Sequence, residues 1–131
     1  MILDLDGFKA INDRYGHDAG DRLLRCFAAR AKEMIRETDL LCRLGGDEFV
    51  IVMPGTGLHG ELEIAERIRA AIASDDFAVA AGGRPIAVTV SAGLAESTGD
   101  SSAALLRRAD RVLYRSKQDG RNRVSVGHAR D

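Results

Sequence analysis

The stretch Arg43-Leu44-Gly45-Gly46-Asp47-Glu48-Phe49 lies between two apolar runs, Leu40-Leu41-Cys42 and Phe49-Val50-Ile51-Val52-Met53. Glycine adopts positive φ without steric cost, so two glycines between apolar runs predict a tight β-hairpin with strands at 39–44 and 48–53. On this segment alone, the two acids that follow the glycines fit solvated side chains beside a turn. The rest of the chain supplies a second group of acids and several cations, which favour a functional role for them.

Size and composition set the class of protein. The chain has 131 residues, of which 45% are hydrophobic, and this fits one globular domain over residues 1–131. Its 19 Lys and Arg nearly balance its 20 Asp and Glu, which argues against a nucleic acid polymer or a membrane surface as partner. No apolar run is long enough to span a bilayer, and no secretion pattern opens the chain. Cys26 and Cys42 lack metal-type spacing, which favours buried free thiols in a reducing cytoplasm.

Apolar periodicity and turn residues predict the secondary structure. The expected elements are a strand at 2–5, helices at 8–16 and 18–36, the hairpin strands, a helix at 58–74, strands at 77–79 and 86–93 joined by a turn at Gly82-Gly83, a helix from 101 or 102 to about 119, a strand at 123–126 and a frayed tail beyond 127. Asp18, Thr56 and Ser101 or Ser102 are the expected N-caps, and Gly120 is the expected C-cap. This order predicts an α+β fold with a central, mainly antiparallel β-sheet flanked by helices.

Asp4 interrupts the apolar run at 2–5, where a carboxylate without a partner is costly. A sheet can place the end of this strand beside the hairpin, so that Asp4, Asp47 and Glu48 converge as oxygen ligands. Such a cluster suits a hard divalent cation, most often Mg²⁺ when phosphates complete its coordination. The alternative is that Asp4 and Asp6 simply flank a turn.

Three polar residues follow on the next two expected helices: Lys9, Asn12 and Asp21. A carboxylate can accept hydrogen bonds from guanine N1 and N2, and an amide can meet O6 or N3, so Asn12 and Asp21 together can read guanine. Lys9 can neutralise a phosphate. Taken separately, each of the three also fits a solvated helix residue.

Residues 4–21 and 43–49 form two long motifs. The first reads Asp4-Leu5-Asp6-Gly7-Phe8-Lys9-Ala10-Ile11-Asn12-Asp13-Arg14-Tyr15-Gly16-His17-Asp18-Ala19-Gly20-Asp21, and the second is the hairpin segment. They resemble the D-x-D-x-F-K-x-I-N-D-x-x-G-H-x-x-G-D signature and the naming motif of GGDEF domains, the bacterial diguanylate cyclases. Residues 109–110 and 117–122 resemble the family's last helix and the turn after it.

The likeness covers nearly the whole chain and is close to the response-regulator type of cyclase. It implies a ferredoxin-like, nucleotidyl-cyclase palm-type sheet. The family's N-terminal helix, with its L-T-G-L-x-N-R-R stretch, does not precede Asp4 here, so we expect an N-terminally truncated domain.

The resemblance implies that two GTP condense to cyclic di-GMP and two pyrophosphates. Each protomer of a homodimer would bind one GTP, and the ribose 3′-hydroxyl of one would attack the α-phosphate of the other. The implied ligands of Mg²⁺, or Mn²⁺, are Asp4, the Leu5 carbonyl, Asp47 and Glu48. The implied catalytic residues are Asp47, which assists deprotonation of the 3′-hydroxyl, Glu48, and Arg43, which offsets charge in the transition state. The implied substrate-binding residues are Asn12 and Asp21 for guanine, Lys9, Lys117 and Arg121 for the phosphates, Gly45 and Gly46 for close backbone approach, and His17.

Arg36-Glu37-Thr38-Asp39 matches the family's R-x-x-D inhibitory motif and lies just before the naming motif. The resemblance implies that cyclic di-GMP binds Arg36 and Asp39, with Arg67 as a secondary contact, and inhibits the enzyme. Arginine can make bidentate contacts with phosphate or with the Hoogsteen edge of guanine. The alternative is a helix-end salt bridge between Arg36 and Asp39.

The family also implies an upstream sensory or receiver domain and a location in the bacterial cytoplasm. Two other functions stay open. A non-catalytic module could sense GTP or cyclic di-GMP, but the intact acid cluster favours catalysis. Another palm-type nucleotidyltransferase, such as a polymerase, would need a basic groove and would leave Asn12 and Asp21 without a role.

Overall fold

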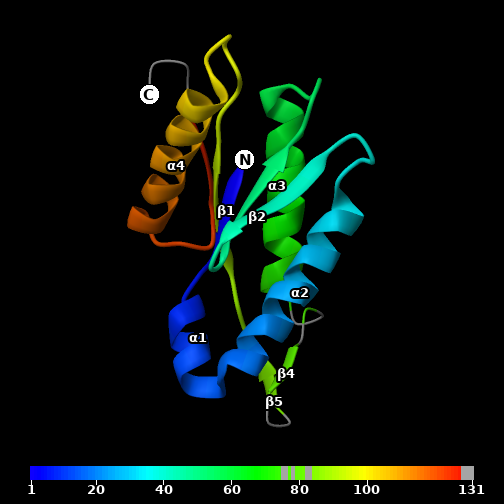
Figure 1. Ribbon diagram of the computed structural model, residues 1–131, viewed down its shortest axis with the longest axis vertical. Coiled ribbons are helices and arrows are strands. Elements are labelled where there is room, and N and C mark those ends of the chain that lie inside the picture. The colour runs from blue at the N-terminus through cyan, green and yellow to red at the C-terminus, as the bar shows by residue number, and fades with distance from the viewer. Residues whose placement is uncertain (75–76, 78, 82–83, 128–131) are drawn as a thin grey trace.

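The computed structural model describes residues 1–74, 77, 79–81 and 84–127 (Figure 1). A five-stranded sheet has the strand order β2-β3-β1-β6-β7, and β4 pairs with β5 in a separate two-stranded ribbon. The elements are β1 (Ile2–Leu5), α1 (Phe8–Tyr15), α2 (His17–Met34), β2 (Leu40–Gly45), β3 (Glu48–Val52), α3 (Leu58–Ala73), β4 (Val79–Ala81), β5 (Arg84–Ile86), β6 (Val90–Leu94), α4 (Ser102–Gln118) and β7 (Val124–Val126).

The first strand is the centre of the sheet. β1 runs antiparallel to both β3 and β6, and β7 joins β6 in parallel. The ladders place Asp4 opposite Glu48 on one side and opposite Ser91 on the other. The predicted α+β fold, a mainly antiparallel sheet flanked by helices, is confirmed.

Helices cover the two faces of the sheet because side chains alternate along each strand. Leu3, Leu5 and Ile51 belong to the core cluster that contains the buried faces of α2 and α3, whereas Ile2 and Val50 pack with Ala109 and Leu113 of α4. Figure 1 shows α4 on one side of the strands and α2 with α3 on the other. The same alternation puts Asp4 on the side of α4.

A glycine in the sheet lets α4 come close. A Cβ added to Gly93 would lie 2.3 Å from the backbone N of Leu113 and 2.5 Å from the backbone O of Ala109, so any side chain here would push the helix away. Near the other end of α4, Ser116 Oγ donates to Ala92 O at 2.8 Å and lies 2.6 Å from Ser125 Oγ. These contacts fix the last turn of α4 over β6 and β7.

The predicted strand at 86–93 is wrong as a single element. The chain forms β5 with the ribbon partner β4, leaves strand geometry over 87–89, and re-enters the central sheet as β6. β-Branched residues continue through this break, so propensity does not reveal that the chain passes from one sheet to another. Residue 78 of the predicted strand at 77–79, the turn at 82–83 and the tail from 128 lie outside the described residues.

The predicted N-caps Asp18 and Thr56 are also wrong. Gly16 and Gly57 are the N-caps of α2 and α3, and neither provides a side-chain hydrogen bond. Thr56 is instead hydrogen-bonded to Arg36, and the first N–H of α3, on Leu58, donates to Glu96 Oε2 at 3.1 Å. Ser101 caps α4 as predicted, and Gly120 follows the C-cap Asp119 with φ of +119°.

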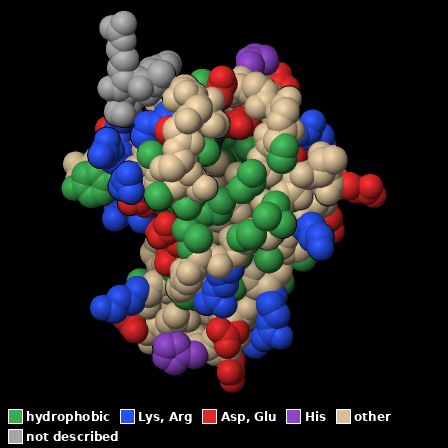
Figure 2. All heavy atoms as spheres, turned by 45° about the horizontal axis from the view of Figure 1, so that its top comes forward, with side chains coloured by type: hydrophobic (Ala, Val, Ile, Leu, Met, Phe, Trp, Pro, Cys, Tyr) green, Lys and Arg blue, Asp and Glu red, His purple; other side chains and the backbone are tan. Residues whose placement is uncertain are grey.

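Apolar side chains remain exposed on the surface. Leu40, Val52 and Leu106 are 56%, 47% and 38% exposed, and Figure 2 shows hydrophobic side chains gathered in the middle of one face. A cavity of about 490 Å³ lies between β1, β3 and α4 and includes Val52 and Leu106 in its lining. The sheet face beside α4 is therefore only partly covered.

Cys26 and Cys42 are free thiols, and both are half-buried rather than fully buried. Among the residues that the structure describes, no helix is both long enough and apolar enough to cross a membrane.

Candidate functional site

Two acids meet where β1 ends beside the β2–β3 turn. The N–H of Leu5 donates to Asp47 O at 3.4 Å, which ties the strand to the turn. Asp4 is 7% exposed, and its Oδ2 is bound by Lys117 Nζ from the last turn of α4. Its Oδ1 has no hydrogen-bond partner among the described residues. A buried carboxylate oxygen without a donor is costly, so this pair of acids is suited to a bound cation.

The protonation of these groups reflects their crowding. Burial and the neighbouring Asp47 carboxyl raise the pKa of Asp4 to about 6, although Lys117 opposes the rise. Burial works against the charge of Lys117, but its contact with Asp4 outweighs burial and raises the pKa of its ammonium group. Burial, then Asp110 and Asp4, raise the pKa of Glu48. An additional positive charge nearby would therefore stabilise the ionised forms of Asp4 and Glu48.

The predicted convergence of three acids is not found as a complete ligand cage. Within the described part of the chain, no group of three or more His, Cys, Asp or Glu side chains is placed to hold a metal ion. Glu48 lies opposite Asp4 in the ladder, yet its strongest charged neighbour is Asp110 of α4. Mg²⁺ is commonly held by one or two carboxylates together with substrate phosphates, and the pair Asp4 and Asp47 fits that requirement.

The glycine turn forms the predicted hairpin. Gly45 pairs with Glu48, and the register shifts between Arg43 and Gly45. Gly46 has φ of +53°, and a Cβ at either glycine would meet nothing within 4 Å, so the backbone is open to an approaching ligand. Arg43 is exposed, and its Nε donates to Gly46 O at 2.9 Å, which braces the turn.

The residues predicted to read guanine, Asn12 and Asp21, lie on α1 and α2, which pack against each other. Asn12 Oδ1 is buried and has no hydrogen-bond partner among the described residues, and a Cβ on Gly20 would lie 1.8 Å from it. The next residue, Asp21, is exposed and lines a cavity of about 560 Å³ together with Arg43. The Asn12 amide, whose oxygen has no partner among the described residues, and the Asp21 carboxylate thus lie on consecutive helices, α1 and α2.

The predicted phosphate-binding cations are less gathered. Lys117 contacts Asp4, and Arg121 lies four residues further on in the exposed turn after α4, with φ of +63°. Lys9 and His17 are exposed on α1 and at the start of α2. The structure therefore joins Lys117 to the acid pair, and its contacts do not place Lys9, His17 or Arg121 against it.

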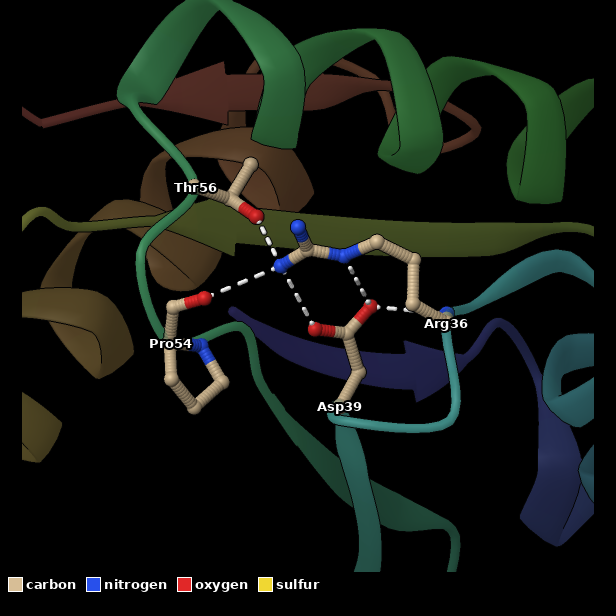
Figure 3. Close-up of polar contacts among 4 residues, drawn as sticks. All are labelled: Arg36, Asp39, Pro54 and Thr56. Carbon is tan, nitrogen blue, oxygen red and sulfur yellow. Dashed lines mark hydrogen bonds and ion pairs between the residues drawn. The ribbon is translucent and has the colours of Figure 1, made fainter.

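A second polar cluster surrounds Arg36, just before β2 (Figure 3). Its Nη2 donates to Asp39 Oδ1 at 3.0 Å and to Pro54 O at 3.0 Å, and also contacts Thr56 Oγ1. Its backbone N–H donates to Asp39 Oδ2 at 2.8 Å. Burial of the Asp39 side chain opposes its charge, but the hydrogen bonds from Arg36 prevail and lower the pKa of Asp39. The salt bridge considered from the sequence is present.

Space for a ligand adjoins this cluster. A cavity of about 590 Å³ is lined by Arg36 and Asp39 together with residues of α2 and β2. Arg67 is exposed on α3, the helix that begins just after Thr56. An ion pair beside an open cavity can exchange part of its hydrogen bonding for a polar ligand.

Three residues of these clusters make contacts that the sequence does not reveal. Thr56 and Pro54 bind Arg36, and Asp6 accepts hydrogen bonds from three distant donors. The contacts of Asp6 join residues that are 83, 85 and 116 positions apart, and such separations leave no local signal. The signals for Asp6 in the sequence are its position directly after a buried strand and its place in the first motif.

Comparisons with known proteins agree with this arrangement. The sequence profile of the family described as diguanylate cyclase, GGDEF domain, matches residues 1–123. The response regulator PleD of Caulobacter vibrioides is 48% identical over 98% of this chain, and the diguanylate cyclase DgcP of Pseudomonas aeruginosa is 42% identical over 95%. This chain spans 29% of PleD and 18% of DgcP.

A solved structure has the same fold. The GGDEF domain of DgcB from Caulobacter crescentus, in complex with c-di-GMP, is 33% identical to this chain and superposes with a TM-score of 0.87. The match covers 95% of this chain and 74% of that one.

The raised pKa of Asp4 predicts a pH-dependent stability. Between its ordinary pKa of 3.8 and its folded pKa of about 6, the folded protein binds more proton at this site than the unfolded chain does. The contribution of protonated Asp4 to the free energy of unfolding is therefore complete below pH 3.8 and is lost as the pH rises through about 6. With EDTA present, we expect Asp4→Asn to increase the free energy of unfolding at pH 7 by on the order of 1 kcal/mol, as measured by urea denaturation.

The increase should shrink at pH 4.5, where Asp4 is already mostly protonated in the folded protein. Asp21→Asn is the matched control, because Asp21 is exposed, and we expect it to leave the stability at both pH values nearly unchanged. A destabilised Asp4→Asn variant at pH 7 would contradict the raised pKa.

Proposed function

The chain belongs to the GGDEF domain family, and we propose that it is a diguanylate cyclase that condenses two GTP into cyclic di-GMP with release of two pyrophosphates. One observation carries the proposal: the buried carboxylate of Asp4 lies beside half-buried Asp47 and an open glycine turn, with one oxygen bound by Lys117 and the other without a partner among the described residues. In each of two steps, a 3′-oxygen would bond to an α-phosphorus as the bond from that phosphorus to pyrophosphate breaks. Reactions of this type depend mainly on positioning and charge stabilisation.

The acid pair would hold the cofactor. Asp4, the Leu5 carbonyl and Asp47 would bind Mg²⁺ or Mn²⁺, and Glu48, opposite Asp4 in the ladder, would assist from beside them. The ion would supply charge neutralisation and activation of the attacking oxygen. Asp47 also stands at the tip of the hairpin, where it can assist in taking the 3′-hydroxyl proton. Arg43 braces the same turn through Gly46 and carries a charge that can offset the transition state.

The nucleotide would lie between the hairpin and α1 with α2. The side-chain amide of Asn12 can meet guanine O6 or N3, while exposed Asp21 can accept from guanine N1 and N2. Gly45 and Gly46 would let the backbone approach. Lys9, Lys117, Arg121 and His17 would complete the phosphate and nucleotide contacts.

One protomer would supply half of the reaction centre. A second copy, related by two-fold symmetry, would bring its own GTP, so that each 3′-hydroxyl faces the other α-phosphate. Because the chain spans a minor part of its relatives, we also propose that an upstream sensory or receiver domain of a longer protein controls this pairing.

Arg36 and Asp39 support a second, regulatory function. Their ion pair adjoins a cavity of its own, and its lining does not include Asp4 or Asp47. We propose that cyclic di-GMP binds there, with Arg67 as a secondary contact, and inhibits the enzyme. If Asp47→Ala left the biological output intact while Arg36→Ala abolished it, a non-catalytic receptor of cyclic di-GMP would be the better function.

Incubation with GTP and Mg²⁺, followed by chromatography of the nucleotides, tests the enzymatic proposal. We expect cyclic di-GMP to form at a rate that rises more than proportionally with protein concentration. Asp47→Ala should lower the rate by about 100-fold or more, because it removes a group that contacts the reacting charge. Glu33→Ala, an exposed acid of α2, is the control. If a version dimerised by a fused coiled coil makes no product, the proposal is wrong.

Inhibition by added cyclic di-GMP tests the regulatory proposal. We expect Arg36→Ala to raise the inhibitory concentration by about tenfold or more, because a charged hydrogen-bonding group is lost. The uninhibited rate should stay close to that of the unmodified protein. Arg107→Ala, which changes an exposed arginine of α4, is the control, and cyclic di-GMP should inhibit it at the same concentration as the unmodified protein. Equal inhibition of both variants would rule out Arg36 as part of the product site.

A further inference from the structure

Asp6 is an acid of the first motif that takes no part in the proposed metal, guanine or phosphate contacts. Its Oδ1 accepts a hydrogen bond from Ser91 Oγ at 2.7 Å. Its Oδ2 accepts from Thr89 Oγ1 at 2.7 Å and from the backbone N–H of Asn122 at 3.1 Å. Both oxygens of Asp6 are therefore occupied by protein donors, in contrast to Asp4, whose Oδ1 has no partner in the described structure.

The donor from Asn122 belongs to an unusual turn. At the end of α4, the N–H of Arg121 donates to Ser116 O at 3.0 Å and the N–H of Gly120 to Lys117 O at 3.4 Å, the pattern of a Schellman motif. Gly120, Arg121 and Asn122 then have φ of +119°, +63° and +46°. Residues other than glycine adopt this conformation at a cost, and they keep it where surrounding contacts determine it.

Two such contacts hold Asn122 from different elements. Asp6, at the end of the central strand, binds its backbone N–H, and Arg69 of α3 donates from Nη1 to its Oδ1 at 3.0 Å. Arg69 is itself oriented by Glu66 at 3.0 Å. The left-handed turn is thus fixed through both its backbone and a side chain.

The turn follows directly on residues that face the acid pair. Lys117, three residues before Gly120, contacts Asp4, while Asn122 contacts Asp6 two residues along the chain from Asp4. The end of β1 therefore binds the segment 117–122 at two points. A displacement of the turn would release Arg121 from the orientation that this backbone imposes.

We propose that Asp6 is a positioning residue, which fixes the left-handed turn at 120–122 and thereby presents Arg121 to the triphosphate of GTP. The inference rests on the proposed function, in which Arg121 binds phosphate. The two acids of the first motif divide their roles: Asp4 faces the metal and Lys117, and Asp6 holds the backbone of the turn. Arg69 supports the same turn from α3.

Preorganisation gives this role a measurable size. An arginine on an unfixed turn must be ordered when the ligand binds, and the lost conformational entropy weakens the affinity for the ligand. We expect Asp6→Ala to weaken the binding of 3′-deoxy-GTP, which cannot react because it lacks the attacking hydroxyl, by about tenfold. Asp6→Asn should bind more tightly than Asp6→Ala, because an amide oxygen can still accept from Asn122.

Calorimetric titration of 3′-deoxy-GTP with Mg²⁺ tests the inference in a double-mutant cycle. Arg121→Ala alone should weaken binding, and Asp6→Ala should cause no further loss in the Arg121→Ala background, since Asp6 acts through Arg121. The Mg²⁺ concentration at half-maximal binding should not change in Asp6→Ala. Arg69→Ala, which removes the other support of Asn122, should weaken binding in the same Arg121-dependent manner, and Arg111→Ala on α4 is its control.

Independent, multiplying losses in the double variant would overturn the positioning role, and so would an unchanged affinity in Arg121→Ala. A shift of the Mg²⁺ requirement in Asp6→Ala would make Asp6 a metal ligand instead. If Asp6→Ala does not fold, the Arg69→Ala cycle decides in the same terms. Absence of 3′-deoxy-GTP binding by the unmodified protein would overturn the proposed function, whereas equal binding by all variants would overturn the positioning role alone.

Discussion

A carboxylate buried in the central strand is the constraint on which the rest of the site depends. Asp4 lies on the α4 side of β1, where its neighbours in the sheet are Glu48 and Ser91. Its charge would be costly there without a cation, and Lys117 supplies one from the last turn of α4. That contact requires α4 to lie close to the sheet, which is possible because Gly93 has no side chain between the strand and the helix. A core packing detail and an ionic contact are thus parts of one arrangement.

The two clusters differ in how they are stabilised, and this suits different functions. The acid pair is crowded, with a raised pKa at Asp4 and an oxygen that finds no partner among the described residues, so it is poised to gain from a cation. The Arg36 cluster is already satisfied by Asp39, Pro54 and Thr56, and a ligand there would have to compete with those contacts. The first arrangement suits the proposed catalytic centre, and the second suits the proposed inhibitory site for cyclic di-GMP.

Local patterns predicted the fold well where the relevant physics is local. The glycines of the hairpin, the helical spacing in α2 and α3 and the cap at Ser101 all depend on neighbours within a few residues, and the structure confirms them. The break between β5 and β6 depends on which sheet each half of the segment joins. Thr56 does not cap α3, and its hydroxyl instead contacts Arg36, which lies 20 residues away in the sequence. The acids of the site could be identified from the motifs, but the network of Asp6 could not, because its donors meet only in the folded chain.

The position of a bound Mn²⁺ tests the central claim most directly. Crystals grown with 3′-deoxy-GTP and Mn²⁺ would give its location from anomalous diffraction. The account predicts a peak in contact with carboxylate oxygens of both Asp4 and Asp47, and Lys117 turned from Asp4 toward a phosphate. A nucleotide-bound structure in which Lys117 stays on Asp4 and the peak lies away from both acids would contradict it.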